Sequence, residues 1–259
     1  MRRLWCWRSS RGTCLVLLFL CAGGCSGLYS NWEVRTNSTP IAPSFYLIPY
    51  EDKPVAVLPA LSLSSLQGTE VWVSHHLFKI LTKAIPTWTV LDEYESLAAI
   101  NKHGLGPEYI QMRREAGDTH LLNRESLRKI GAALGVRYIF QPRLAYFSQA
   151  TTYRWEFPAV DLWFLFTHSS VMRISLQLWE IESGKVMWSS MAEAFMQGDA
   201  FSYRPVYLED LVRVTLGGLV TDFLNKRTAS KYSTLDKLMV NPLNEKEEPK
   251  EEPKEELAE

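Results

Sequence analysis

The hydrophobic period of this chain changes near residue 136, and the change limits the folds that it can adopt. Within residues 73–84 apolar side chains recur at helical spacing. Within residues 172–178 they alternate with polar ones, which is the period of a strand with one buried face. Helical segments followed by alternating strands predict an α/β (α+β) domain, with a mixed sheet flanked by helices.

Residues 54–230 are expected to form this domain, with elements in the order β-α-β-α-α-β-β-β-α. Short apolar segments at 55–58 and 88–91 predict two strands near its start. Three more strands follow residue 136, and the segment 182–185 predicts a hairpin turn because its glycine is free to take a positive φ. Pro142 lacks an N–H for the ladder, so its part of the first of these strands is assigned to an edge or a bulge.

The helices of the domain are indicated by their caps. Asp92, with Glu95 three residues later, forms a capping-box pattern, and Asn123 is the expected N-cap of the next helix. Residues 108–122 are polar and fit either a helix or a loop. The apolar residues of 208–223 recur at helical spacing and predict the last helix.

The first 24 residues have the layout of a secretory signal. A basic segment is followed by an apolar run at 14–21, far shorter than the ~20 residues that a spanning helix needs. Residues 22–24, Ala-Gly-Gly, precede Cys25 and with it resemble the lipobox of bacterial lipoproteins. The resemblance implies cleavage after Gly24, acylation of Cys25 (palmitate included) and, since Ser26 is not Asp, the outer membrane. Ordinary cleavage that leaves a soluble protein is the alternative.

All four cysteines of the chain lie at or before position 25. A chain that begins at Cys25 therefore keeps a single cysteine, which the lipid would occupy. Thiol catalysis and cysteine-based zinc sites are then excluded, and no disulfide is expected, although an exported protein could form one.

Two segments beside the domain are expected to lack regular structure. Residues 25–53 carry polar residues and three prolines, and are interpreted as a lipid anchor and flexible linker in which the apolar run 45–48 docks on the domain. Residues 231–259 end in Lys-Glu-Glu-Pro repeats and predict a disordered acidic tail, a solvated spacer more than a binding segment.

The near-zero net charge of the chain is a sum over unlike parts. Residues 1–25 carry +4, residues 244–259 carry −5, and residues 26–243 carry 21 basic and 21 acidic side chains. A neutral domain favours neither nucleic acid nor electrostatic adhesion to anionic lipid as a partner.

Residues 131–140 predict the end of a helix at a glycine, followed by a strand. Residues 176–188 predict a hairpin with acidic, Gly-Lys and Trp positions. This pattern resembles periplasmic lipoproteins related to the curli secretion-channel protein CsgG. It is also similar to the amino-terminal domain of TolB and to the activator lipoproteins of peptidoglycan synthases. The resemblance implies a binding or assembly module and not a catalyst. In channel-forming relatives, the membrane hairpins come from inserts between strands of this core.

The segment 148–170 is interpreted as an aromatic insert between two strands. Three roles are open: it caps the sheet of its own domain, it contacts a protein partner, or it enters the membrane interface, where Trp and Tyr are common. The aromatic residues that carry the hypothesis of a partner or membrane contact are Tyr153, Trp155, Phe157, Trp163, Phe164 and Phe166.

The sequence carries no recognisable catalytic or cofactor motif. It has no Walker A loop, no dinucleotide-binding glycine pattern and no nucleophile elbow. His75 and His76 are adjacent, so on a helix they project about 100° apart and cannot form an i,i+4 metal pair. His103, His120 and His168 are isolated and are interpreted as structural or surface residues. No cofactor and no metal are expected, and the chain is not expected to be an enzyme.

These observations predict a lipid-anchored lipoprotein of the bacterial outer membrane that faces the periplasm. Its expected role is that of a non-catalytic accessory subunit of a secretion, transport or cell-wall complex, with an envelope protein as partner. An oligomeric pore or ring built from copies of the chain is the alternative, and an enzyme with a dispersed site is a third, less favoured one.

Overall fold

A computed structural model describes residues 30–47, 54–62, 68, 70–156, 163–200 and 207–234 of the protein. The predicted signal peptide, Gly24, Cys25 and the acidic repeats lie outside these residues. The helices are η1 (Pro43–Leu47), α2 (Glu70–Ala84), α3 (Glu93–Lys102), α4 (Gly106–Thr119), α5 (Arg124–Leu134) and α6 (Leu208–Asn225). The strands are β1 (Ser30–Ser38), β2 (Val55–Val57), β3 (Leu61–Ser62), β4 (Val90–Leu91), β5 (Tyr138–Glu156), β6 (Trp163–Glu180), β7 (Lys185–Ala200) and β8 (Ala229–Ser233).

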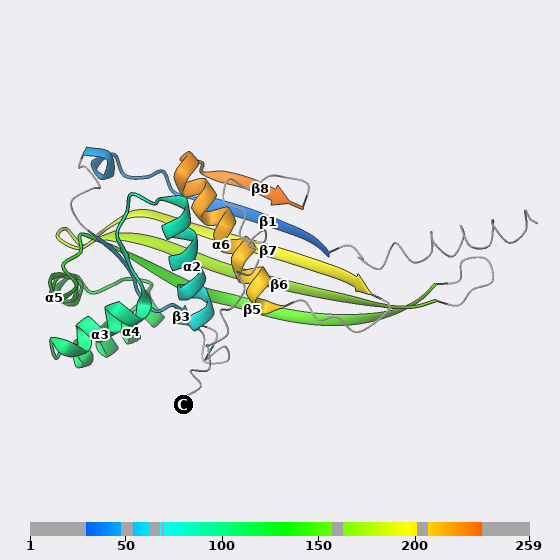
Figure 1. The fold of residues 1–259 in the computed structure, drawn as a ribbon, viewed down its shortest axis with the longest axis horizontal. Coiled ribbons are helices and arrows are strands. Elements are labelled where there is room, and N and C mark those ends of the chain that lie inside the picture. The colour runs from blue at the N-terminus through cyan, green and yellow to red at the C-terminus, as the bar shows by residue number, and fades with distance from the viewer. Residues whose placement is uncertain are drawn as a thin grey trace, which may run out of the picture.

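The described strands form one mixed sheet in the order β4-β2-β5-β6-β7-β1-β8, with β3 also beside β5 (Figure 1). Strand β2 is parallel to β4 and β5, and β3 is parallel to β5. The pairs from β5 to β8 are antiparallel. The mixed α/β class is confirmed, and the ambiguous segment 108–122 is mostly helix α4.

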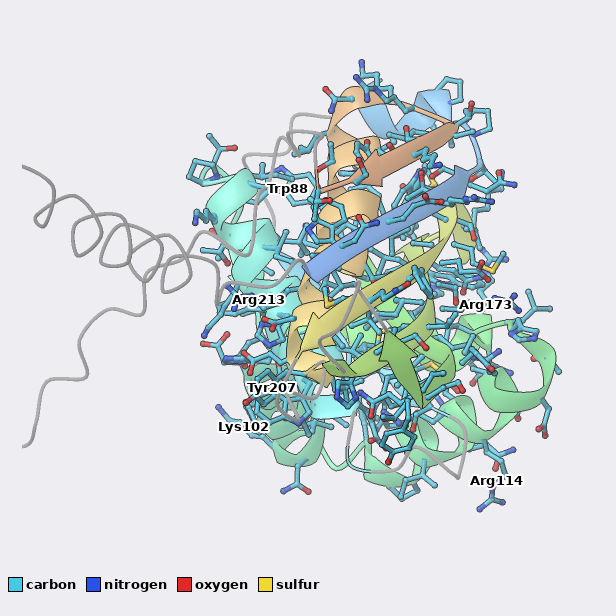
Figure 2. All side chains as sticks on the ribbon, turned by 90° about the vertical axis from the view of Figure 1, so that its right-hand side faces the viewer. Trp88, Lys102, Arg114, Arg173, Tyr207 and Arg213 are labelled. Carbon is cyan, nitrogen blue, oxygen red and sulfur yellow. The ribbon has the colours of Figure 1, made fainter. Side chains whose placement is uncertain are left out.

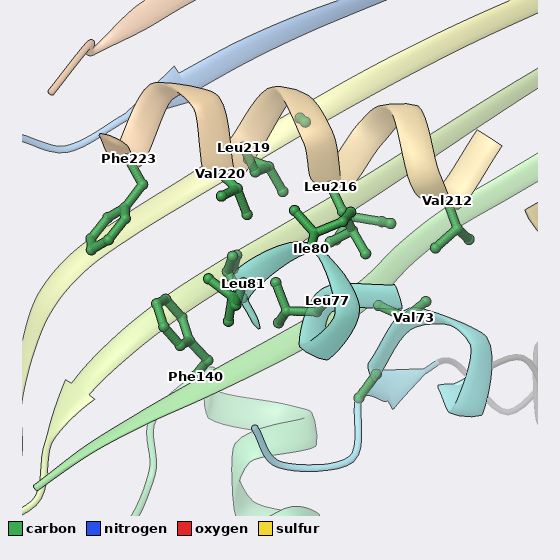
Figure 3. Close-up of a cluster of buried hydrophobic side chains, with 14 of the residues drawn as sticks. Val73, Leu77, Ile80, Leu81, Phe140, Val212, Leu216, Leu219, Val220 and Phe223 are labelled. Atoms are coloured by element: carbon green, nitrogen blue, oxygen red, sulfur yellow. The ribbon is translucent and has the colours of Figure 1, made fainter. Parts of the chain in front are cut away.

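Helices cover the two faces of the sheet unequally. Helices α2 and α6 pack side by side on one face, the inner face, where they bury Leu77, Leu81, Leu216 and their neighbours over the long strands (Figure 3). Helices α3, α4 and α5 pack on the other, outer face and form a smaller core with β2 and the adjoining ends of β5 and β6. Among the described residues, the outer face of β7, β1 and β8 therefore carries no helix.

The prediction of a flexible linker at 25–53 is wrong for residues 30–38, which form β1 in the interior of the sheet between β7 and β8. Trp32 and Val34 alternate with Glu33 and Arg35, and both apolar side chains are buried. The two inward positions after them are Thr36 and Ser38, so the alternation is present but half of it is polar. Hydroxyls that find buried partners allow a polar-looking segment to occupy an interior strand.

The predicted boundary of the tail at residue 231 is also wrong, because β8 continues to Ser233. The expected docking of residues 45–48 is confirmed for Phe45, which is buried in the 3₁₀ turn η1. Its ring meets Tyr138 and Phe223 edge-on, with centroids 5.1 Å and 5.8 Å away.

Pro142 lies where the strands beside β5 change. Strand β2 pairs with β5 as far as Phe140, β3 begins at Arg143, and the register against β6 shifts between Leu144 and Tyr146. The missing N–H therefore falls in a gap between two partner strands, next to a bulge. The hairpin turn is also as predicted, with Gly184 at a φ of +66°.

Candidate functional site

Strands β5 and β6 extend beyond the rest of the sheet as a two-stranded arm (Figure 1). The last pair between β6 and β7 is Phe166 with Ala200, whereas β5 and β6 stay in register to Glu156 and Trp163. The expectation of an irregular aromatic insert at 148–170 is therefore wrong at both ends: residues 148–156 and 163–170 continue the ladder.

Five of the six candidate contact residues lie on this arm. Tyr153 is opposite Phe166 in the register, Trp155 is opposite Phe164, and Trp163 ends the ladder. The side chain of Tyr153 is exposed. Phe157 lies outside the described residues. Whether the aromatic side chains contact lipid, a partner or their own sheet stays a prediction.

The start of β1 lies at the same end of the sheet as the arm. Ser30 pairs with Gly198, Gly198 with His168, and His168 with Thr151, so the four residues form one row across four strands. Strand β5 continues for five residues beyond this row, about 17 Å at 3.3 Å per residue. Cys25 precedes the row by five residues, which span at most about 17 Å. The chain therefore enters β1 at the end of the sheet from which the arm projects.

Along most of the arm, β5 is an open edge. On the side away from β6, β5 pairs with β2 and β3 only through Leu144, and no described strand pairs with it from Ala145 to Glu156. The side chains of residues 148–153 are exposed. Unpaired N–H and C=O groups in such a strand are a template for an added strand. Sequence reasoning missed this edge because the alternation of a strand does not reveal how many partners it has.

Three of the five histidines lie against other polar side chains. His168 is buried, and its Nδ1 lies 3.0 Å from the hydroxyl of Thr151. His76 Nε2 lies 3.1 Å from a Glu209 carboxylate oxygen. His75 Nδ1 lies 4.0 Å from Glu93, whose burial raises the pKa of its carboxyl. Within the described part of the chain, no group of three or more His, Cys, Asp or Glu side chains is placed to hold a metal ion. None of the helices described there is both long and apolar enough to cross a membrane.

Comparisons with known proteins give structural likeness only. No protein-family model and no curated protein matches the sequence. The fold is similar to the PelC dodecamer from Paraburkholderia phytofirmans, at 12% identity over 71% of this chain and 94% of that one, with a TM-score of 0.38. It is similar to lipoprotein GNA1162 from Neisseria meningitidis, at 15% identity over 67% and 96% of the two chains, with a TM-score of 0.37. It is also similar to the LpoB C-terminal domain from Salmonella enterica, at 16% identity over 56% and 84%, with a TM-score of 0.34. Likeness at this level assigns neither a family nor a function.

Proposed function

We propose that this chain is a bacterial lipoprotein that is anchored in the outer membrane through Cys25 and faces the periplasm. There it serves as a non-catalytic accessory subunit that assembles a secretion, transport or cell-wall complex. The lipobox-like residues 22–25 support the anchor. The observation that carries the proposal is the shared position of the start of β1 and the β5–β6 arm at one end of the sheet.

The tether between the proposed anchor and the domain is short, which restricts the movement of the domain. Only four residues separate Cys25 from an interior strand, and they leave the domain little freedom to move away from the membrane. A binding edge held so close to the anchor searches a thin layer of the periplasm, which raises the effective concentration of partners in the same membrane.

Recognition would use the open edge of β5. The carbonyl of Phe140 accepts a hydrogen bond from the N–H of Leu58, the residue after β2, so the backbone of Phe140 points away from β6. Backbone direction alternates along a strand, and the bulge before Tyr146 shifts the alternation by one residue. The backbone groups of the odd-numbered residues from 147 to 153 therefore point away from β6, to the side on which no described strand pairs with this part of β5.

The open edge also favours the second candidate function, a ring or pore built from copies of the chain. An edge strand pairs with another copy as readily as with a different protein. Light scattering behind size-exclusion chromatography separates the two: a monomer at micromolar concentration supports the accessory subunit, and a discrete oligomer supports the ring.

The anchor is tested by metabolic labelling with palmitate in a bacterial host. We expect the label to be lost in a Cys25→Ala variant and kept in Cys21→Ala, the matched control four residues earlier. Equal labelling of Cys25→Ala and the unchanged chain would disprove lipidation at this residue.

The edge is tested with a photocrosslinking residue at Ala150, on the exposed part of β5. Gln149→Pro removes an N–H that points away from β6, so we expect the crosslink to be lost while the β5–β6 ladder is kept. Ser148→Pro removes an N–H that points toward β6, and we expect it to destabilise the arm itself. A crosslink that survives Gln149→Pro would refute recognition through this edge.

A further inference from the structure

A cationic groove lies on the outer face of the sheet, against the C-terminal end of α4. Its volume is about 1010 Å³, and it is lined from α4, β3, β5, β6, β7 and the end of β1. Three guanidinium groups line it, those of Arg113, Arg114 and Arg143, and Asp118 is the single carboxylate among the lining residues. Figure 2 shows Arg114 on the same side of the molecule as Arg173 of β6, whereas Arg213 of α6 lies on the other side.

Two of these arginines are held by neutral acceptors. Arg143 Nη2 donates to the carbonyls of Ala116 and Gly117 at 2.9 Å and 2.6 Å. Arg113 Nη1 and Nη2 donate to the carbonyls of Pro59 and Ala60 at 3.2 Å and 3.1 Å. Carbonyl oxygens fix the guanidinium groups in place without neutralising them.

The groove stays positive after its other charges are counted. Arg114 is exposed and forms no ion pair with any described residue. Asp118 offsets one charge, and the carbonyl end of α4 beside Arg143 adds about half a negative charge. A net positive charge remains in a domain segment that is neutral as a whole.

The opposite wall supplies polar groups that suit a chain of carboxylates. Ser175 and Ser189 lie there at outward positions of β6 and β7, and Asn37 and Gln177 add amide groups. The groove therefore pairs fixed positive charge on one side with neutral hydrogen-bonding groups on the other.

We propose that this groove binds an extended segment rich in carboxylates, and that its occupant is residues 244–259 of the same chain. This segment carries eight glutamates and three lysines, a charge of −5 opposite in sign to the groove. The proposal is independent of lipidation at Cys25 and of the open edge of β5.

The chain is long enough for this contact. Strand β8 ends beside Trp32, whose carbonyl accepts a hydrogen bond from the N–H of Thr234. The groove lies three strands across the sheet and five residues along it, a straight distance of about 22 Å at 4.8 Å per strand and 3.3 Å per residue. Residues 235–243 span up to about 30 Å when extended, so the acidic segment can enter the groove.

The test is paramagnetic relaxation enhancement on the full chain. The four native cysteines are replaced by serine, and a spin label is attached to a cysteine introduced by Leu257→Cys. We expect the amide signals of Gly117, Asp118 and Ser189 to broaden at low ionic strength. The broadening should vanish in about 1 M NaCl, where the Debye length falls to about 3 Å.

Matched charge reversals make the test specific. Arg114→Glu should reduce the broadening severalfold, whereas Arg128→Glu, an exposed arginine of α5 outside the groove, should leave it unchanged. Replacing the eight glutamates of 244–259 by glutamine should abolish it. Unbroadened groove signals, or equal effects of the two reversals, would overturn the proposal. A third result would also overturn it: the groove signals shift when a poly-glutamate peptide is added, but the spin-labelled segment leaves them unchanged. The occupant would then be an external chain.

Discussion

The attachment of β1 and β8 to the domain depends on a buried carboxylate, that of Asp222 in α6. Asp222 is fully buried and accepts hydrogen bonds from the hydroxyls of Thr36 in β1 and Tyr232 in β8, the latter at 2.5 Å. Burial, and then the hydrogen bond to Asp222, raise the pKa of the Tyr232 hydroxyl. Asp222→Ala removes this acceptor.

The expected loss in the free energy of unfolding follows from these two hydrogen bonds. A hydrogen bond to a charged group contributes about 1.5–3 kcal/mol, so losing both costs roughly 3–6 kcal/mol. The hydroxyls of Thr36 and Tyr232 remain buried in the variant and lose the Asp222 acceptor, and Thr36 keeps only a longer bond to the carbonyl of Ser230, at 3.3 Å. Tyr232→Phe removes one of the bonds and should cost about 1.5–3 kcal/mol. Because the two substitutions share that bond, the double variant should lose less than the sum of the single losses.

The assay is urea unfolding at neutral pH of the chain from residue 26 onward, followed by tryptophan fluorescence. Asp210→Ala, the same substitution at a half-buried site on the same helix, is the control, and we expect it to change the free energy of unfolding by less than about 1 kcal/mol. If Asp222→Ala costs no more than this control, the buried carboxylate does not hold β1 and β8, and the reasoning is refuted.

Three further predictions concern the outer helices and the hairpin. Gly131→Ala places a methyl group 2.5 Å from Cγ2 of Ile181. The resulting strain of about 1–3 kcal/mol should exceed the helix-propensity gain of about 1 kcal/mol, so the variant should be less stable. Thermal unfolding should show that this loss of stability is smaller in an Ile181→Ala background. Asp92→Ala removes the capping box of α3 and should lower stability by about 0.5–2 kcal/mol, with faster hydrogen exchange in the first turn; unchanged exchange would contradict the cap. Burial alone would raise the pKa of the Glu180 carboxyl, but hydrogen bonds from a serine hydroxyl and from Arg137 hold it below 4.5. The stability that this pair gives is therefore present above pH 4.5 and lost as the pH falls through the lowered pKa, so the deficit of Glu180→Gln in urea unfolding should fade in acid.

The features that the sequence predicts well are those fixed by neighbouring residues. The capping box of Asp92 and Glu95 is present, with both reciprocal hydrogen bonds, and Asn123 caps α5 through its side chain. The hairpin turn at Gly184 depends on one residue that tolerates a positive φ. In each of these cases the interacting groups lie within a few residues of each other, so the chain needs no distant partner to adopt the structure.

Elements that depend on distant partners could not be predicted in the same way. Strand β1 pairs with residues 190–198, and its inward Thr36 is stabilised by Asp222, which is 186 positions away. The open edge of β5 is defined by the partners that it lacks, and the cationic groove joins segments from six strands and helices. The composition of the arm indicates an aromatic segment, but the sequence does not indicate that the arm is a strand ladder. Strand pairing beyond the core leaves no distinct hydrophobic period.

The placement of β1 changes how far the predicted anchor would allow the domain to move from the membrane. A flexible linker of 28 residues would allow the domain to move about 90 Å from the membrane, whereas the four residues before β1, five steps from Cys25 to Ser30, allow about 17 Å. On the proposal that Cys25 is lipidated, the sheet is then held with the arm toward the membrane. Asn37, at the groove, lies seven residues further along β1 than Ser30, about 23 Å deeper in the periplasm. A partner strand on the β5 edge would therefore bind close to the lipid surface, whereas a ligand of the groove would bind at a greater height. The two surfaces can act on different components of one assembly because the rigid sheet fixes the distance between them.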